Sequence, residues 1–296
     1  MAKSLNEKIL EDIEKTGFVT ELETVSKFLK RGWTVDHSPT FEDFDFKISR
    51  EIDLIARKNI FDWDSKAWPS ITLVIEVKKD TKRPWVIFSS PQDNFPNDHL
   101  GWNLLHVAQN YKSKNIIDSD SSLKPINIFE NTVLDEPDFF KLPRNFGRAF
   151  HEAFKPPQEK SKIYESLLTV SKATWYSYRR LIDNQLKSYR KATEWKHENS
   201  TYLDIFIPIV LLDGQLFEVK LSAEGEKDLT EVDYIPVSFI YSSPNYVEEF
   251  NQINFYPLIA QANSIEMIME RMESWLESIK IKMEKVIEER IEYFGL

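Results

Sequence analysis

Two acidic residues and a lysine occupy positions that a buried β-strand normally gives to aliphatic side chains. Glu76 and Lys78 lie within the apolar, β-branched run at residues 71–79, and Asp53 lies in a second short apolar stretch upstream. Side chains alternate along a strand, so Glu76 and Lys78 share one face of the predicted strand. Burying an unpaired charge is costly, so such a set persists when its members pair with one another or hold a cation.

Phosphodiester hydrolysis is a reaction that this set of side chains suits. Carboxylates of Asp53 and Glu76 on adjacent strands would lie roughly 5 Å apart. Together with the backbone carbonyl of Val77 they would form an oxygen-rich site of the kind that Mg²⁺ (or Mn²⁺) accepts. Such a metal lowers the pKa of a bound water and polarises a phosphoryl oxygen. Lys78 would position the attacking water and offset phosphate charge.

The spacing of these residues is similar to that of a known family. Asp53, followed after a long gap by Glu76-Val77-Lys78, resembles the PD-(D/E)xK signature of the restriction-endonuclease-like nucleases. Glu21 lies on a predicted helix that runs through Gly32-Trp33 into a strand, and it resembles the acidic residue that many members carry before their first strand. Ile52 stands where the family often has proline.

The resemblance covers residues 17–90 and implies both a fold and an activity. It implies an α/β (α+β) fold with a restriction-endonuclease-like αβββαβ core, whose mixed central sheet is flanked by helices. It also implies a metal-dependent nuclease, with DNA as the first expected substrate and Mg²⁺ or Mn²⁺ as cofactor. The implied metal site contains Asp53, Glu76, Val77 and Glu21, with Lys78 beside it.

The pattern at the start of the first core helix indicates different roles for Glu21 and Glu23. Thr20 and Glu23 have the spacing of a capping box, which would give Glu23 a role at the helix start. Glu21 lies near the apolar face of the predicted helix and is therefore assigned to the metal site. Glu23 remains the alternative, and a first-turn acid favoured by the helix dipole is the structural alternative for Glu21.

Other polar clusters are weaker candidates for chemistry. Glu218-Val219-Lys220 repeats the Glu-x-Lys pattern, but its strand alternates as a half-exposed strand does, so both charges are expected to face solvent. The acids at residues 42–45 are expected to form a solvated turn between strands. His99 and His106, on a predicted helix at residues 100–111, have no third ligand nearby for a zinc site.

The rest of the chain is interpreted as an elaboration of one nuclease domain spanning residues 1–296. Leu203 to Leu212 and Leu216 to Leu221 are predicted to form a hairpin around Asp213-Gly214. A further strand is expected at residues 234–241. The predicted segments are the catalytic αβββ part at 17–90, an insertion at 91–158, a helix and the remaining strands at 159–242, and a long C-terminal helix at 261–294.

Charge is distributed unevenly along the chain. The net charge of −10 disfavours nucleic-acid binding in general, yet residues 141–196 contain 8 Lys and 5 Arg against 4 Glu and 1 Asp. This segregation permits a basic surface on an acidic protein, although a solvated helix face explains any single residue equally well. The candidate phosphate contacts are Lys172, Arg179, Arg180, Lys187 and Arg190 on a helix predicted within 159–195, with Lys82 and Arg83 after the catalytic strand.

Composition excludes several functional classes. The chain has no cysteine, which excludes disulfides and thiolate chemistry, and it has no Gly-rich phosphate loop that would bind ATP. No long apolar segment or secretory leader is recognisable, so a cytoplasmic protein without a membrane partner is expected. The alternative to an enzyme is a catalytically inactive nuclease-like module that binds nucleic acid or protein. Nothing in the residues separates DNA from RNA, and a homodimer would suit double-strand cutting.

Overall fold

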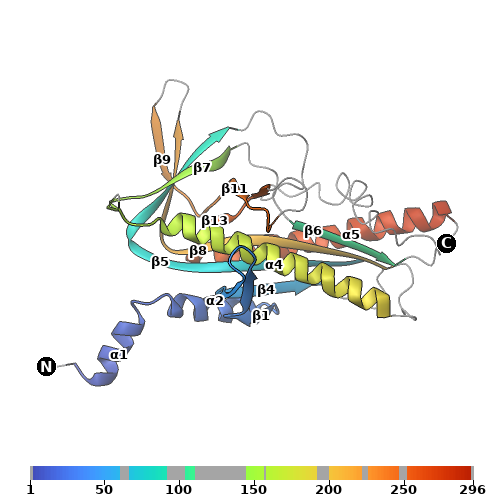
Figure 1. The fold of residues 1–296 in the computed structure, drawn as a ribbon, viewed down its shortest axis with the longest axis horizontal. Helices are drawn as coiled ribbons and strands as arrows, with labels where there is room; N and C mark the ends of the chain where they lie inside the picture. The colour runs from blue at the N-terminus through green and yellow to red at the C-terminus, as the bar shows by residue number, and fades with distance from the viewer. Residues whose placement is uncertain are drawn as a thin grey trace.

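Figure 1 shows a computed structural model of the chain, a mixed α/β arrangement in which helices flank a central mixed sheet. The structure describes residues 3–60, 67–91, 104–110, 145–156, 158–191, 200–221, 226–246 and 252–294. The helices in these ranges are α1 (Leu5–Ile13), α2 (Phe18–Lys30), α4 (Lys162–Lys191), the 3-10 helix η1 (Ala262–Ser264) and α5 (Ile265–Phe294).

The strands follow the same chain order. They are β1 (Thr34–His37), β2 (Thr40–Asp43), β3 (Ile48–Glu51), β4 (Leu54–Asn59), β5 (Ala67–Pro91), β6 (Leu104–Asn110), β7 (Asn145–Glu152), β8 (Ser200–Leu221), β9 (Lys227–Glu231), β10 (Tyr234–Pro236), β11 (Phe239–Ser242), β12 (Gln252–Phe255) and β13 (Leu258–Gln261).

The order of strands across the central sheet is β1-β4-β5-β8-β13-β10 within the described part of the chain. β4 is antiparallel to both β1 and β5, whereas β5, β8 and β13 are parallel to one another. Parallel neighbours need a crossover connection, and α4 lies between β5 and β8 in the chain. The β2–β3 hairpin leaves this sheet between β1 and β4.

β5 and β8 are long strands that stay paired along most of their length. Their parallel register runs from Ala67 beside Thr201 to Ser89 beside Lys220, with an irregularity between Asp80 and Trp85. The predicted hairpin around Asp213-Gly214 is therefore wrong, because both predicted strands belong to the single strand β8. A Cβ added to Gly214 would lie 2.5 Å from the carbonyl oxygen of Asp80, so this glycine permits a close approach of two backbones and makes no turn.

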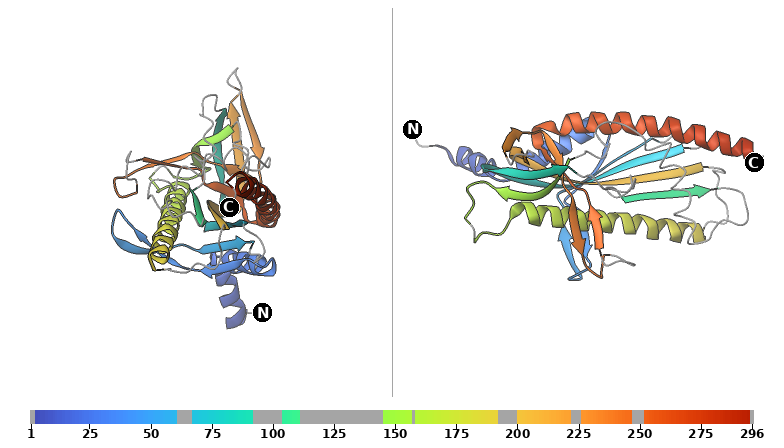
Figure 2. Two further views of the ribbon diagram at one scale, coloured as in Figure 1. Left: turned by 90° about the vertical axis from the view of Figure 1, so that its right-hand side faces the viewer. Right: turned by 90° about the horizontal axis from the view of Figure 1, so that it is seen from above.

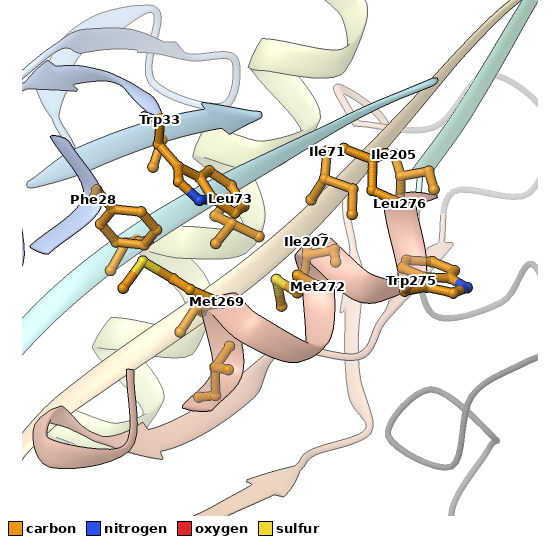
Figure 3. Close-up of a cluster of buried hydrophobic side chains, with 14 of the residues drawn as sticks. Phe28, Trp33, Ile71, Leu73, Ile205, Ile207, Met269, Met272, Trp275 and Leu276 are labelled. Atoms are coloured by element: carbon orange, nitrogen blue, oxygen red, sulfur yellow. The ribbon is translucent and has the colours of Figure 1, made fainter. Parts of the chain in front are cut away.

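Two hydrophobic clusters cover the two faces of the sheet. Figure 3 shows the first, in which Phe28 of α2 and Met269, Met272 and Leu276 of α5 pack on strand residues such as Ile207. Helices with apolar residues at three- and four-residue spacing bury one stripe in this way. The long helix predicted at 261–294 therefore packs on the sheet of its own chain, and Figure 2 shows α5 extending along the sheet.

α4 covers the opposite face of the sheet, as the views of Figure 2 show. Its fully buried residues Ile163, Leu167 and Val170 recur at helical spacing and belong to the second cluster. Phe41 of β2 and Ile52, which follows β3, join the same cluster. The β2–β3 hairpin thus packs against α4 as well as linking two strands of the sheet.

Two further secondary-structure predictions differ from the structure. The predicted helix at residues 100–111 is wrong where the chain is described, because Leu104–Asn110 form strand β6 beside β8. Pairing with a strand far along the chain outweighs the local helical pattern there. The predicted strand at 234–241 is split into β10 and β11, which belong to different sheets.

β6 and β7 come from the segment predicted as an insertion, and both pair with the central sheet. None of the helices in the described ranges is both long enough and apolar enough to cross a membrane.

Candidate active site

The pairing of β4 with β5 brings Asp53 and Glu76 together. Leu54 lies opposite Ile75 in this antiparallel pair, so continuing the register by one residue places Asp53 beside Glu76. Asp53 directly precedes β4, one residue outside the strand in which it was predicted. Its Oδ2 accepts a hydrogen bond of 2.6 Å from the backbone N–H of Val77. A second hydrogen bond, 2.8 Å from the N–H of Ser38 to the carbonyl oxygen of Asp53, ties the backbone to the end of β1.

Glu21 reaches the same place from the first turn of α2. Its side chain is buried, whereas that of Glu23 is exposed. The predicted capping box is wrong, because α2 begins at Phe18 and Thr20 already lies inside it. Thr20 instead donates a hydrogen bond of 2.9 Å from Oγ1 to Oδ2 of Asp213. This contact fixes the first turn of α2 against β8 and so sets the direction of Glu21.

The three carboxyl groups are close enough to hinder one another's ionisation. Burial raises the pKa of Glu76 to about 7, although Lys78 opposes this shift, and the charges of Asp53 and Glu21 raise it further. Burial likewise raises the pKa of Glu21, with Asp53 adding to the effect. The pKa of Asp53 is also raised by burial, against the hydrogen bond from Val77 and the charge of Lys78. In a group of three neighbouring acids with raised pKa values, ionisation is unfavourable unless positive charge offsets it.

Lys78 supplies part of that positive charge. Its Nζ donates a hydrogen bond to Oε1 of Glu76, two residues away on the same face of β5. Burial alone would lower the pKa of Lys78, but the charges of Glu76, Asp53 and Glu21 outweigh burial and raise it. The side chain of Glu76 is 9% exposed and that of Lys78 is 31% exposed, so the lysine faces the open side of the cluster.

His37 is a member of this cluster that the sequence did not single out. Its Nε2 lies 3.5 Å from Oε2 of Glu21, and it is the last residue of β1. A signal was available in the chain order, because antiparallel neighbours place the end of β1 level with the start of β4. The register confirms this, with His37 opposite Leu54 and so next to Asp53.

The donor set suits a hard divalent cation in its chemistry. Glu21, Asp53 and Glu76 offer carboxylate oxygens, which a divalent cation would bind in competition with protons. In their present rotamers, however, the described residues contain no group of three or more His, Asp or Glu side chains arranged to hold a metal ion. The ammonium of Lys78 sits on Glu76, so metal binding there requires Glu76 to exchange that contact. The carbonyl of Val77 as a ligand stays a prediction.

The predicted phosphate contacts whose side chains the structure describes differ in exposure and in partners. The prediction that Lys172 contacts phosphate is wrong, because this residue is only 3% exposed and pairs with Asp43 and Asp45. Arg83 pairs with Glu159. Arg179 is half-buried over the ring of Trp175, while Arg180 and Lys82 are exposed. The side chains of Lys187 and Arg190 lie outside the part that the structure describes, as does His99.

The acids at residues 42–45 do not form the solvated turn that was predicted. Asp43 ends β2 and is 1% exposed, and Asp45 follows in the turn. In the second Glu-x-Lys motif, Lys220 is exposed as expected, but Glu218 is half-buried and accepts a hydrogen bond of 2.6 Å from Ser89 Oγ. That motif lies on β8 near β9, apart from the cluster of Glu21, Asp53 and Glu76.

Comparisons with protein-family models, curated proteins and solved structures found no match to this chain.

Proposed function

We propose that this protein is a metal-dependent nuclease that hydrolyses phosphodiester bonds, with DNA as substrate and Mg²⁺ or Mn²⁺ as cofactor. The observation that carries the proposal is the convergence of Glu21, Asp53 and Glu76 from separate elements onto one buried place beside Lys78. Structural ion pairs normally balance their charges, whereas here three acids face one ammonium group and the imidazole of His37. The excess of negative charge is what a divalent ion would offset.

The order of elements also supports the proposal. α2, β1, β4, β5, α4 and β8 follow one another in the αβββαβ order that the resemblance implies, and the strands among them are neighbours in the sheet. Glu21 lies on the helix before the first of these strands, Asp53 directly precedes the second strand β4, and Glu76 lies on the third strand β5. The β2–β3 hairpin, β6 and β7 are additions to this order.

The residues of the cluster have separate parts in the proposed reaction. Glu21, Asp53 and Glu76 would hold the metal, which when bound lowers the pKa of a water and polarises a phosphoryl oxygen. Lys78 would leave Glu76 and orient the attacking water beside the phosphate. The water oxygen bonds to phosphorus, one ester oxygen leaves, and that oxygen takes up a proton. The buried, aliphatic surroundings strengthen each of these electrostatic interactions.

A cleavage assay with matched variants tests the proposal. Supercoiled plasmid, single-stranded DNA and RNA are each incubated with the protein in Mg²⁺, in Mn²⁺ or in EDTA. We expect metal-dependent cleavage of DNA by the wild type, and a loss of more than about 100-fold in Asp53→Asn and Glu76→Gln, because even outer-shell changes at metal sites cost 10–100-fold. Glu218→Gln, in the other Glu-x-Lys motif, is the control and should cut as the wild type does.

The outcomes distinguish whether the protein cuts nucleic acid from whether Asp53 and Glu76 form its active site. Undiminished metal-dependent cleavage in Asp53→Asn would refute the site. Cleavage of RNA alone would keep the chemistry and change the substrate.

A second candidate function is a nuclease-like module that binds nucleic acid or protein without cutting. The contact of Lys78 with Glu76 favours it, because an internal ammonium already neutralises one of the acids. The two functions differ in metal binding, since an inactive module of this kind gains no stability from Mn²⁺.

A further inference from the structure

Lys172 is a buried lysine held by acids from a distant segment. Its Nζ donates hydrogen bonds to Oδ1 and Oδ2 of Asp43 at 2.9 and 3.2 Å and to Oδ2 of Asp45 at 2.7 Å. The hydrogen bonds outweigh the effect of burial, so the pKa values of both acids are lowered and that of Lys172 is raised. All three groups therefore stay charged, and α4 is joined to the tip of the β2–β3 hairpin by ionic hydrogen bonds.

Aromatic rings enclose the same ammonium group. The centroids of Phe46, Tyr241 and Tyr246 lie 5.3, 5.1 and 5.2 Å from Nζ of Lys172, within the range of a cation–π interaction. The hydroxyl of Tyr241 also donates to Asp45. A lysine with these contacts is fully satisfied within the chain, so this cluster is not a site for an external ligand.

The acids have further partners that close the hairpin. Arg50 of β3 donates from Nε to Oδ2 of Asp43 at 2.7 Å, across the hairpin from β2. Ser243 and Asn245 donate to Oδ1 of Asp45. The hairpin is therefore held at its tip by α4 on one side and by residues 241–246 on the other.

The base of the same hairpin leads directly into the candidate active site. His37 ends β1, three residues before the hairpin begins at Thr40, and Asp53 is the second residue after β3 ends. Ile52, between β3 and Asp53, is fully buried in the cluster under α4, and its N–H donates to the carbonyl oxygen of Pro39 at 3.0 Å. A movement of the hairpin away from α4 would therefore displace Ile52, and Asp53 directly follows Ile52 in the chain.

We propose that Lys172 is a positioning residue for Asp53: by fixing the β2–β3 hairpin on α4, it holds the Asp53 carboxylate against the N–H of Val77. The proposal rests on the proposed function for its catalytic meaning, but the positioning itself can be measured without metal or substrate. The reporter is the hydrogen bond from Val77 N–H to Asp53, because it joins the end of the hairpin to the strand that carries Glu76.

The experiment follows the Val77 amide by NMR in protein labelled with ¹⁵N-valine, assigned with Val77→Ile. Lys172→Met removes the ammonium but keeps much of the side-chain volume. We expect the Val77 amide to shift upfield and its hydrogen exchange to accelerate by at least about tenfold, as in Asp53→Ala, because its acceptor has moved. Asp45→Asn, which keeps the contact of Lys172 with Asp43, should shift the amide in the same direction and less.

Lys155→Met is the matched control. Lys155 is also largely buried, with 13% of its side chain exposed, and it lies 3.6 Å from the fully buried carboxylate of Glu152, outside the hairpin. Its loss should leave the Val77 amide unchanged. A wild-type Val77 amide in folded Lys172→Met overturns the proposal, and if that variant does not fold, a wild-type amide in Asp45→Asn overturns it equally.

Cleavage measured on the same variants separates this inference from the proposed function. Loss of cleavage in Lys172→Met together with a displaced Val77 amide supports both. A displaced Val77 amide in Lys172→Met, together with a wild type that cuts nothing under any condition, supports the positioning and contradicts the nuclease.

Discussion

Glu76 is a carboxyl group whose pKa the fold raises into the range of physiological pH. Its neighbours explain this, because burial and the charges of Asp53 and Glu21 outweigh the contact with Lys78. The protonated form of this carboxyl group is a weaker hydrogen-bond acceptor than the carboxylate, and something positive must replace the proton to restore the carboxylate. At this position either Lys78 or a metal can do so, and the competition between them decides how the site behaves.

Stability in the absence of metal should depend on pH through Glu76. Its pKa is raised from 4.5 to about 7, so the folded state binds the proton more tightly than the unfolded state. The resulting stabilisation is fully present below pH 4.5 and is lost as the pH rises through about 7. We expect the wild type to lose up to about 3 kcal/mol of unfolding free energy between pH 4.5 and 8 that Glu76→Gln does not lose.

Urea unfolding of both proteins in EDTA at a series of pH values measures this difference. Glu218→Gln serves as the control for removing one acid elsewhere and should follow the wild type. Parallel pH profiles for the wild type and Glu76→Gln would contradict the shifted pKa.

The packing of β8 against β5 depends on the absence of a side chain at Gly214. β8 passes so close to β5 here that a Cβ at Gly214 would lie 2.5 Å from the carbonyl oxygen and 3.1 Å from the carbonyl carbon of Asp80. Backbone atoms cannot swing aside as the end of a side chain can. β5 carries Glu76 and Lys78 only a few residues before Asp80. The close contact between the backbones of β5 and β8 therefore lies next to the candidate active site.

Gly214→Ala should therefore destabilise the protein by about 1–3 kcal/mol, the usual cost of overpacking a tight contact. The measurement is the free energy of unfolding in urea. Gly17→Ala is the control, because a Cβ there would meet only Oε1 of Glu21 at an ordinary 3.5 Å. Equal stabilities for the two variants would show that β5 and β8 can separate at this point without cost.

Local patterns predicted the elements of the site better than the elements around it. The strand bearing Glu76 and Lys78 follows from a short apolar run rich in β-branched residues, and the helix bearing Glu21 follows from its apolar face. The Asp213-Gly214 pair was misread because a tight turn and a close backbone approach both favour glycine. Residues 104–110 were misread because their partner in β8 lies about 100 residues away.

Long-range pairing explains the remaining differences at the site. Nothing near Lys172 in the sequence indicates that it pairs with Asp43 and Asp45. The basic residues on one side of the predicted helix were therefore interpreted as an exposed phosphate-binding surface. The role of Thr20 was missed for the same reason, since its partner Asp213 lies on β8. The sequence therefore predicts acidic residues that come together on neighbouring strands, but it does not predict ion pairs between residues far apart in the chain.

Metal binding should increase the free energy of unfolding of the whole protein. An ion that binds only the folded state stabilises it by RT ln(1 + [L]/Kd), which is about 2.7 kcal/mol at a concentration of 100 Kd. We expect Mn²⁺ at pH 8 to raise the midpoint of thermal unfolding of the wild type. Asp53→Asn should respond much less, because it lacks a ligand and keeps the rest of the chain.

Calorimetry or dye-based melting at several Mn²⁺ concentrations checks this expectation, with Glu218→Gln as the control that should respond fully. An equal rise in Asp53→Asn would mean that Mn²⁺ binds elsewhere. No rise in any of the proteins would favour the non-catalytic module.

The parallel pairing of β5 with β8 also bears on when this chain can fold. Glu76 lies beside Val210, about 130 residues later, so the contact order of the central sheet is high. Closing so long a loop is slow, and parallel sheets built this way form late. During synthesis, β5 must therefore wait for residues 200–221 to leave the ribosome with its hydrophobic edge open to other nascent chains. We expect the yield of soluble protein to rise when translation is slowed or a chaperone shields that edge.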